Sequence, residues 1–231
     1  MKRFRALLFD VDGVIAETEE VHRRAFNESF AYFDLPWIWD VELYRKLLQV
    51  AGGKERIRHF LGSRPGSERE LSHNEIDELH RLKTQFYARM INAGDCELRP
   101  GIADLIKQAL DWKQRLGIVT TTSRYNVNAL LEVTLGRSWT SCFDVIVCGE
   151  DVEHKKPAPD AYLKAVRLLD LPPRSCLAIE DSRNGLVAAC SAGVPALMTR
   201  SRYFHHEEFD EAIGVVDDLT ILKNFNLGLP T

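Results

Sequence analysis

Short apolar runs rich in β-branched residues recur along the chain and predict six strands. They lie at residues 6–11, 115–120, 144–148, 176–180, 195–198 and 214–216. Apolar positions three and four residues apart predict helices between them, at residues 101–116, 160–171 and 185–193. Because strands that alternate with helices form parallel sheets covered on both faces, the pattern predicts an α/β fold with a Rossmann-like parallel sheet.

Segment 17–93 breaks this alternation. It contains no run with strand character and four stretches of helical pattern, at residues 18–31, 40–48, 54–61 and 72–92. Loops rich in glycine, serine and proline separate these stretches. The pattern therefore predicts a helical insert, residues 17–93, within a core domain of residues 1–16 and 94–231. We expect hinges at both junctions, near residues 16–18 and 93–100.

Composition excludes several classes of partner. The 231 residues are 45% hydrophobic and 28% charged, as in an ordinary globular protein. The net charge of −4 provides no basic surface for nucleic acid, and no apolar run approaches the ~18 residues that cross a bilayer. We therefore expect a cytoplasmic protein without a nucleic-acid or membrane partner. Because the sequence has no apolar heptad pattern, we also expect a monomer.

Polar side chains follow four of the predicted strands. In chain order they are Asp10 and Asp12, Thr120 and Thr121, Lys156, and Glu180 and Asp181. The carboxyl ends of parallel strands meet at one edge of the sheet, where α/β proteins bind their ligands. We therefore expect these side chains, which come from four separate segments, to form one site.

The carboxylates at this edge predict a metal ion, because acids this close cannot all ionise unless a cation compensates. Hard oxygen ligands favour Mg²⁺ over zinc. The candidate ligands are Asp10, Asp12, Glu180 and Asp181. Mg²⁺ commonly binds a phosphate as well, so we expect a hydroxyl from Thr120 or Thr121 and the ammonium of Lys156 to stabilise phosphoryl oxygens during transfer.

Asp10 is the candidate nucleophile, because it closes the first strand and can present one oxygen to the metal and the other to phosphorus. Its attack would form an aspartyl phosphate, which divides one difficult step into two easier ones. Asp12 lies two residues further on, in a different local setting. It is the candidate acid that protonates the leaving alcohol and then the base that deprotonates the attacking water.

These residues fall in four motifs that resemble those of a known family. In order and over nearly the whole chain, DVDGV, GIVTTTS, KKPAPD and IEDSRNG are similar to the motifs of the haloacid dehalogenase superfamily of phosphatases and phosphomutases. Segment 17–93 resembles the C1-type cap of that superfamily. The resemblance places all the acids, Lys156 and Thr120 on motif positions, with Thr121 as the alternative hydroxyl, since three threonines run together.

Within the superfamily, DVDGVIAETEEVHRRAF is similar to the segment shared by CbbY-type sugar phosphatases and β-phosphoglucomutases. In that group, the positions of Thr18 and His22 contact the substrate or shield the site. The resemblance to the CbbY type implies a phosphatase that removes xylulose-1,5-bisphosphate, a sugar bisphosphate that inhibits Rubisco.

A bisphosphate needs cations away from the metal site, and the cap sequence offers them. The candidate substrate-binding residues of the hinge and cap are Glu17, Thr18, His22, Gly52, Gly53, Lys54, Arg58 and Lys83. Lys54 and Lys83 are expected to bind the distal phosphate, and Glu17 and His22 to face the sugar hydroxyls. The two glycines allow the backbone to approach a phosphate, and cap closure would exclude bulk water.

Three alternatives stay open at this point. A mutase of the β-phosphoglucomutase type would return the phosphoryl group from Asp10 to a sugar. A phosphatase of a small monophosphate such as phosphoglycolate would not depend on Lys54 or Lys83. A non-catalytic sugar-phosphate sensor would release no phosphate.

Overall fold

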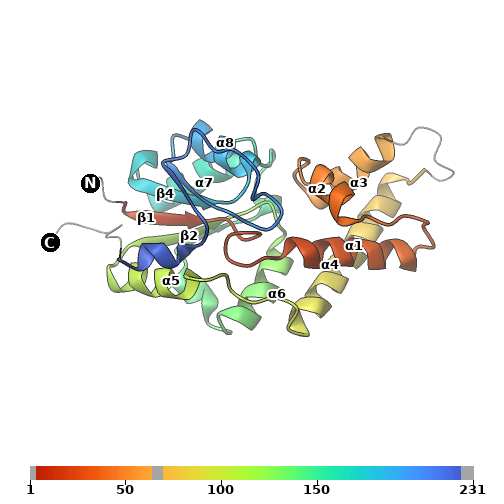
Figure 1. Ribbon diagram of the computed structural model, residues 1–231, viewed down its shortest axis with the longest axis horizontal. Helices are drawn as coiled ribbons and strands as arrows, with labels where there is room; N and C mark the ends of the chain where they lie inside the picture. The colour runs from red at the N-terminus through yellow and green to blue at the C-terminus, as the bar shows by residue number, and fades with distance from the viewer. Residues whose placement is uncertain (1–3, 64–69, 225–231) are drawn as a thin grey trace.

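Six parallel strands form the sheet in this computed structural model, which describes residues 4–63 and 70–224. The strands are β1 (Ala6–Phe9), β2 (Arg115–Val119), β3 (Val145–Val147), β4 (Cys176–Glu180), β5 (Ala196–Thr199) and β6 (Gly214–Val216). Their order across the sheet is β3-β2-β1-β4-β5-β6, so that β1 lies between β2 and β4 (Figure 1). The predicted α/β fold with a parallel sheet is confirmed.

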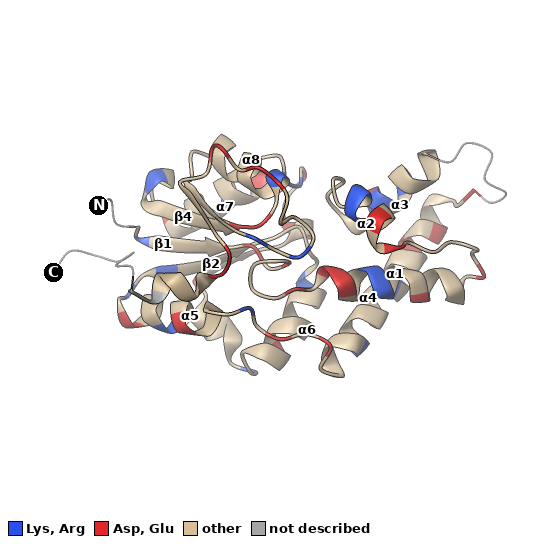
Figure 2. Cartoon of the chain, viewed as in Figure 1, with Lys and Arg blue, Asp and Glu red and all other residues tan. Residues whose placement is uncertain are grey.

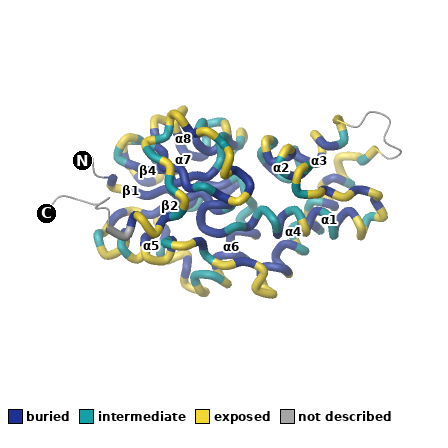
Figure 3. Tube along the Cα trace, in the orientation of Figure 1, coloured by how far each residue is buried: buried dark blue, intermediate teal, exposed yellow. Residues whose placement is uncertain are grey.

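Helices cover both faces of this sheet. They are α5 (Ile102–Asp111) and α6 (Arg124–Thr134) on one face, and α7 (Asp160–Leu169) and α8 (Arg183–Ser191) on the other (Figure 1). Successive side chains of a strand point to opposite faces, so Phe9 packs with α5 and α6, whereas Leu8 packs with α7 and α8. Burial on both faces (Figure 3) explains why β1 is wholly apolar and why β2 and β4 are apolar except at Arg115 and Glu180.

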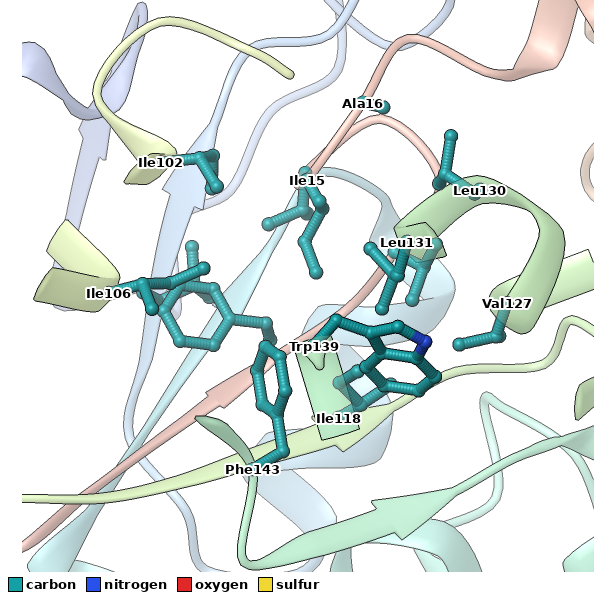
Figure 4. Close-up of a cluster of buried hydrophobic side chains, with 14 of the residues drawn as sticks. Ile15, Ala16, Ile102, Ile106, Ile118, Val127, Leu130, Leu131, Trp139 and Phe143 are labelled. Atoms are coloured by element: carbon teal, nitrogen blue, oxygen red, sulfur yellow. The ribbon is translucent and has the colours of Figure 1, made fainter. Parts of the chain in front are cut away.

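The face under α5 and α6 holds a large apolar cluster that reaches the segment after β1 (Figure 4). Trp139 and Phe143 belong to it, with ring centroids 6.1 Å apart. Ile15 and Ala16 are fully buried in the same cluster. Since burying a large apolar side chain contributes roughly 1.5–3 kcal/mol, these contacts fix the chain directly behind the acidic pair that follows β1.

Four helices occupy the segment predicted as a cap. They are α1 (Glu19–Tyr32), α2 (Val41–Leu47), α3 (Gly53–Gly62) and α4 (His73–Asn92). Phe26, Phe30 and Trp39 pack against one another at the centre of this group. Ser72 and Glu75 form a capping box that starts α4. The cap therefore has a hydrophobic core of its own.

Two chain segments join the cap to the core, and they lie side by side. Ala16 pairs with Leu98 in an isolated β-bridge. The Arg99 amide donates a hydrogen bond of 2.8 Å to the Ile15 carbonyl oxygen. The Arg99 guanidinium is also buried and donates to carbonyl oxygens of Gly13 and of the segment after β5. Motion at either connection must therefore involve the other.

A third contact between the domains comes from the core segment that links β5 to β6. Tyr203 and Phe204 of this segment pack into the aromatic core of the cap. The rings of Tyr203 and Tyr44 meet edge to face, with centroids 5.7 Å apart. The Tyr203 hydroxyl also donates a hydrogen bond of 2.7 Å to Glu20 at the start of α1. These contacts hold the cap against the core.

The structure differs from the sequence prediction at two helices. The helix predicted to reach residue 116 ends at Asp111, because the chain turns at Lys113, where φ is 56°, before entering β2. Helix α6 was not predicted. Residues 1–3 and 225–231 of the predicted core and residues 64–69 of the predicted cap lie outside the described residues. None of the helices in residues 4–63 and 70–224 combines the length and apolar character that a bilayer crossing requires.

Candidate active site

Three buried carboxylates lie together at the carboxyl edge of the sheet. Asp10 follows β1, Glu180 ends β4 and Asp181 comes next, and one oxygen of each lies within 4.8 Å of the others. Glu180 Oε2 and Asp181 Oδ2 are buried without a hydrogen-bond partner. Buried polar atoms are rarely left unpaired, so these oxygens suit the ligand shell of a cation. Gly13 allows the close approach, since a Cβ there would lie 1.9 Å from Asp181 Oδ2.

The charges in this cluster also call for a cation. Burial raises the pKa of Asp10 and that of Asp181, and it raises the pKa of Glu180 to about 7. Repulsion among the three acids adds to this effect. One ammonium, that of Lys156, lies 2.6 Å from Glu180 and 3.2 Å from Asp10. A single positive charge does not balance three carboxylates, and a hard divalent cation such as Mg²⁺ fits the all-oxygen donor set.

Lys156 reaches the cluster from the segment that follows β3. Its side chain is 3% exposed, and its ammonium donates to the carbonyl oxygen of Val119 at 2.7 Å. Burial lowers the pKa of Lys156, but attraction from Asp10 and Glu180 outweighs burial and leaves the pKa raised. The ammonium therefore stays charged and fixed beside Asp10.

Asp12, also predicted as a metal ligand, lies apart from this cluster. The side-chain carboxylate of Asp12 does not belong to the acidic cluster, because its oxygens accept hydrogen bonds from Thr18, Thr122 and, at 3.2 Å, from His22. Burial alone would raise the pKa of Asp12, but His22 and these donors lower it well below its ordinary value. Asp12 is thus held as a carboxylate at the border between core and cap.

His22 connects Asp12 to the cap. Lys83 of α4 lies with its Nζ 2.7 Å from His22 Nδ1, so Nε2 carries the imidazole proton and faces Asp12. The His22 ring stacks on Tyr87, with centroids 4.2 Å apart. Burial, aided by Lys83, lowers the pKa of His22 to about 4, and burial lowers the pKa of Lys83 to about 7. The Lys83 ammonium is therefore held beside His22.

Two adjoining cavities surround these groups. A small one of about 50 Å³ is lined by Asp10, Asp181 and Lys156. A larger one of about 440 Å³ lies between core and cap and is lined by residues of both. Figure 2 shows acidic and then basic residues along the start of α1, where that helix adjoins the core. A substrate with its reacting phosphate at Asp10 would extend its other end into the larger cavity.

The larger cavity contains several of the predicted cap residues. Gly52, Gly53, Lys54 and Lys83 all line it. Gly52 has a φ of 92°, and a Cβ on Gly53 would lie 2.4 Å from His80 Nε2. Gly53 therefore lets the start of α3 approach α4 closely, whereas Gly52 leaves room for Glu55 and Lys155.

Three predicted substrate-binding residues, Glu17, Thr18 and Arg58, do not line either described cavity. The Thr18 hydroxyl donates to Asp12 instead. Glu17 accepts a hydrogen bond of 3.2 Å from the Arg202 amide and lies 3.4 Å from Arg99, so it joins the hinge to the core. Arg58 is exposed on the outer side of α3. Its neighbour Arg56 is buried at the cavity instead.

The three threonines at residues 120–122 make different contacts. The Thr120 hydroxyl is buried and accepts a hydrogen bond of 3.2 Å from the Thr122 amide. Thr121 lines both cavities, and the Thr122 hydroxyl donates to Asp12. Sequence reasoning gave no role to Thr122. Among the other residues that line the larger cavity, Glu19, His80 and Lys155 were also given no role, and Arg56 was not among the candidate site residues. The lysine pair in KKPAPD and the basic run in AGGKERIR were the available signals.

The fold and this site define a hydrolase of phosphoric monoesters. The chain belongs to the haloacid dehalogenase-like hydrolase family, whose model matches residues 4–193. It is 48% identical over 219 residues to the protein CbbY of Rhodobacter capsulatus, covering 94% of each chain. It is 48% identical over 217 residues to CbbY of Cereibacter sphaeroides, covering 94% of this chain and 93% of that one.

Solved structures agree with these relatives. The chain is similar to a crystal structure of CbbY from Rhodobacter sphaeroides in complex with phosphate, with a TM-score of 0.90, 47% identity and coverage of 95% of this chain and 96% of that chain. It is also similar to the D10N mutant of that protein in complex with xylulose-1,5-bisphosphate. That match has a TM-score of 0.92 and 46% identity, and it covers 98% of this chain and 100% of the other.

Proposed function

We propose that this protein is a Mg²⁺-dependent phosphatase that hydrolyses xylulose-1,5-bisphosphate through an aspartyl phosphate on Asp10. The observation that carries the proposal is the match over 98% of the chain to CbbY in complex with that sugar bisphosphate. In this role the protein acts as a cytoplasmic monomer and relieves the inhibition of Rubisco.

The geometry supports a distinct role for each core residue. Asp10 attacks phosphorus, and the fixed ammonium of Lys156 offsets charge on the transferring oxygens. For the first step Asp12 must carry a proton when the substrate is bound, and it gives that proton to the leaving sugar oxygen; the carboxylate that remains then takes a proton from the attacking water. Asp10, Glu180 and Asp181 would hold Mg²⁺, which would supply positive charge to offset the charge on the phosphoryl group.

The larger cavity supports a substrate with a second phosphate. Lys54 and Lys155 line it, and both are paired with acids near the protein surface, at 2.8 Å to Asp77 and Glu55 respectively. Ion pairs of this kind contribute little to stability, so a phosphate can replace the acid as partner. The hydroxyl of Ser123 adds a donor from the core side of the same cavity.

A screen of phosphate release tests this function. The protein is incubated with Mg²⁺ and with xylulose-1,5-bisphosphate, other sugar mono- and bisphosphates, glucose phosphates and phosphoglycolate. The proposal predicts the highest kcat/KM for the pentulose bisphosphate. Isomerisation of a glucose phosphate without phosphate release would show a mutase, and turnover restricted to phosphoglycolate would show a small-monophosphate phosphatase. Binding without turnover would show a sensor.

A further inference from the structure

Glu19, in the first turn of α1, lies where the two cavities meet. Only four described residues line both cavities: Asp12, Glu19, Arg56 and Thr121. A substrate that places its reacting phosphate at Asp10 and its other end in the larger cavity must pass this junction. The atoms that pass it are those of the carbon chain next to the reacting phosphate.

The Glu19 carboxylate is held in place from one side. The Tyr44 hydroxyl donates a hydrogen bond of 2.9 Å to Glu19 Oε2. Arg56 in turn donates to the Tyr44 hydroxyl at 3.1 Å, and it is fixed by further hydrogen bonds to the carbonyl oxygens of Leu47 and Val50. Glu19 is therefore a positioned acid at the junction rather than a mobile surface side chain.

The other oxygen of Glu19 is free to accept. Among residues 4–63 and 70–224, no donor is found for Glu19 Oε1, and that atom is not among the fully buried ones. Both oxygens of Asp12, the second carboxylate at the junction, already accept hydrogen bonds from threonine hydroxyls. Glu19 thus offers the junction an acceptor oxygen that no described side chain uses. Burial raises the pKa of Glu19 to about 7, so this acceptor is a carboxylate above that pH.

A carboxylate in a phosphate-binding site discriminates between ligands by charge. It accepts a strong hydrogen bond from a hydroxyl, and it repels a second carboxylate or a phosphate at the same place. We infer that Glu19 determines substrate specificity, by accepting a hydrogen bond from a hydroxyl next to the reacting phosphate and by rejecting acid monophosphates such as phosphoglycolate. The inference rests on the proposed function in taking a phosphorylated sugar as the substrate.

The test compares kcat/KM for xylulose-1,5-bisphosphate and for phosphoglycolate in the parent and in Glu19→Gln, at a pH above the Glu19 pKa of about 7. The amide keeps the shape of the side chain and removes its charge. Loss of a hydrogen bond to a charged group predicts that the ratio of the two values falls by about 10- to 100-fold, with phosphoglycolate turnover constant or raised. Tyr44→Phe, which frees the carboxylate, should lower the ratio by less.

Glu28→Gln is the matched control, because Glu28 lies on the same helix but forms a surface ion pair with Arg89. It should leave the ratio unchanged. Equal losses on both substrates in Glu19→Gln would show a merely structural role and overturn the inference, as would an unchanged ratio. If the parent instead hydrolyses another sugar phosphate, the proposed substrate is wrong. The ratio of kcat/KM for that sugar phosphate to kcat/KM for phosphoglycolate then tests the role of Glu19 in the same way. A parent that turns over only phosphoglycolate overturns both.

Discussion

The core and the cap contribute to the site in different ways. Core groups are buried and held by several partners: Lys156 is 3% exposed and its ammonium contacts three oxygens. Lys54 of the cap has a side chain that is 39% exposed and forms one ion pair. Fixed charges stabilise a transition state at no reorganisation cost, whereas exposed ion pairs exchange partners easily. We therefore assign the chemistry to the core and the selection of substrate to the cap.

The largest effect should come from the core nucleophile. Asp10→Asn should lower turnover by at least about 10⁴ on every substrate, because no carboxylate then attacks phosphorus. The change is nearly isosteric, so the circular dichroism spectrum should match that of the parent. Substantial activity in this variant would remove Asp10 from the role of nucleophile.

Removing Mg²⁺ should have the next largest effect. The buried acids that cluster around Asp10 repel one another without it, and loss of several kcal/mol of charge stabilisation corresponds to about 10³ in rate. The loss of rate is measured as phosphate release in excess EDTA, and its recovery is measured after Mg²⁺ is added back. Full activity in EDTA would contradict the metal site.

A cap cation should affect selection rather than chemistry. Lys54→Ala should lower kcat/KM for a bisphosphate relative to a monophosphate by about 10- to 100-fold, the loss expected for a hydrogen bond to a charged group. Arg58→Ala, one turn further along α3 and exposed, is the matched control and should leave the ratio unchanged. If Lys54→Ala lowered kcat/KM equally for both substrates, the division between core and cap would be wrong.

Lys83→Ala should lower kcat/KM for the bisphosphate and for the monophosphate alike, because Lys83 acts through His22.

The smallest effect concerns stability and pH. Burial and nearby cations lower the pKa of His80 to about 3 from 6.5, so below pH 6.5 the unfolded chain binds a proton that the folded protein excludes. Stability is therefore lost as pH falls from 6.5 toward 3, by at most about 1.4 kcal/mol per pH unit from this group. Urea unfolding of the parent and of His80→Gln measures the difference. A steeper loss in the variant would contradict the assignment.

The strands and their ends could be predicted because a sheet leaves few choices. Once β1, β2 and β4 are parallel neighbours, Asp10, Thr120 and Asp181 must emerge at one edge. The cap helices were also predictable from apolar spacing. Helix α6 was missed even though Ser123 caps its start and Val127, Leu130 and Leu131 have helical spacing.

The cap side of the site could not be predicted in the same way. A helix turns by about 100° per residue, so Arg56 and Arg58 point in nearly opposite directions, and only packing of α3 decides which of them is buried. Glu19 and Glu17 also differ in position. Glu19 faces the cavities, whereas Glu17 accepts a hydrogen bond from the Arg202 amide. Lys155 lies at the larger cavity because its neighbour Lys156 pairs with Asp10 and Glu180, and these pairs fix the segment after β3.

The most direct measurement asks whether Asp10 carries a covalently bound phosphoryl group during turnover. Excess protein is mixed with Mg²⁺ and xylulose-1,5-bisphosphate that carries a phosphorus label, quenched in acid within a single turnover, and digested for mass spectrometry. The account predicts a labelled acyl phosphate on the peptide that contains Asp10, and its absence in Asp10→Asn. Release of labelled phosphate at the full rate with no label on Asp10 at any quench time would contradict it.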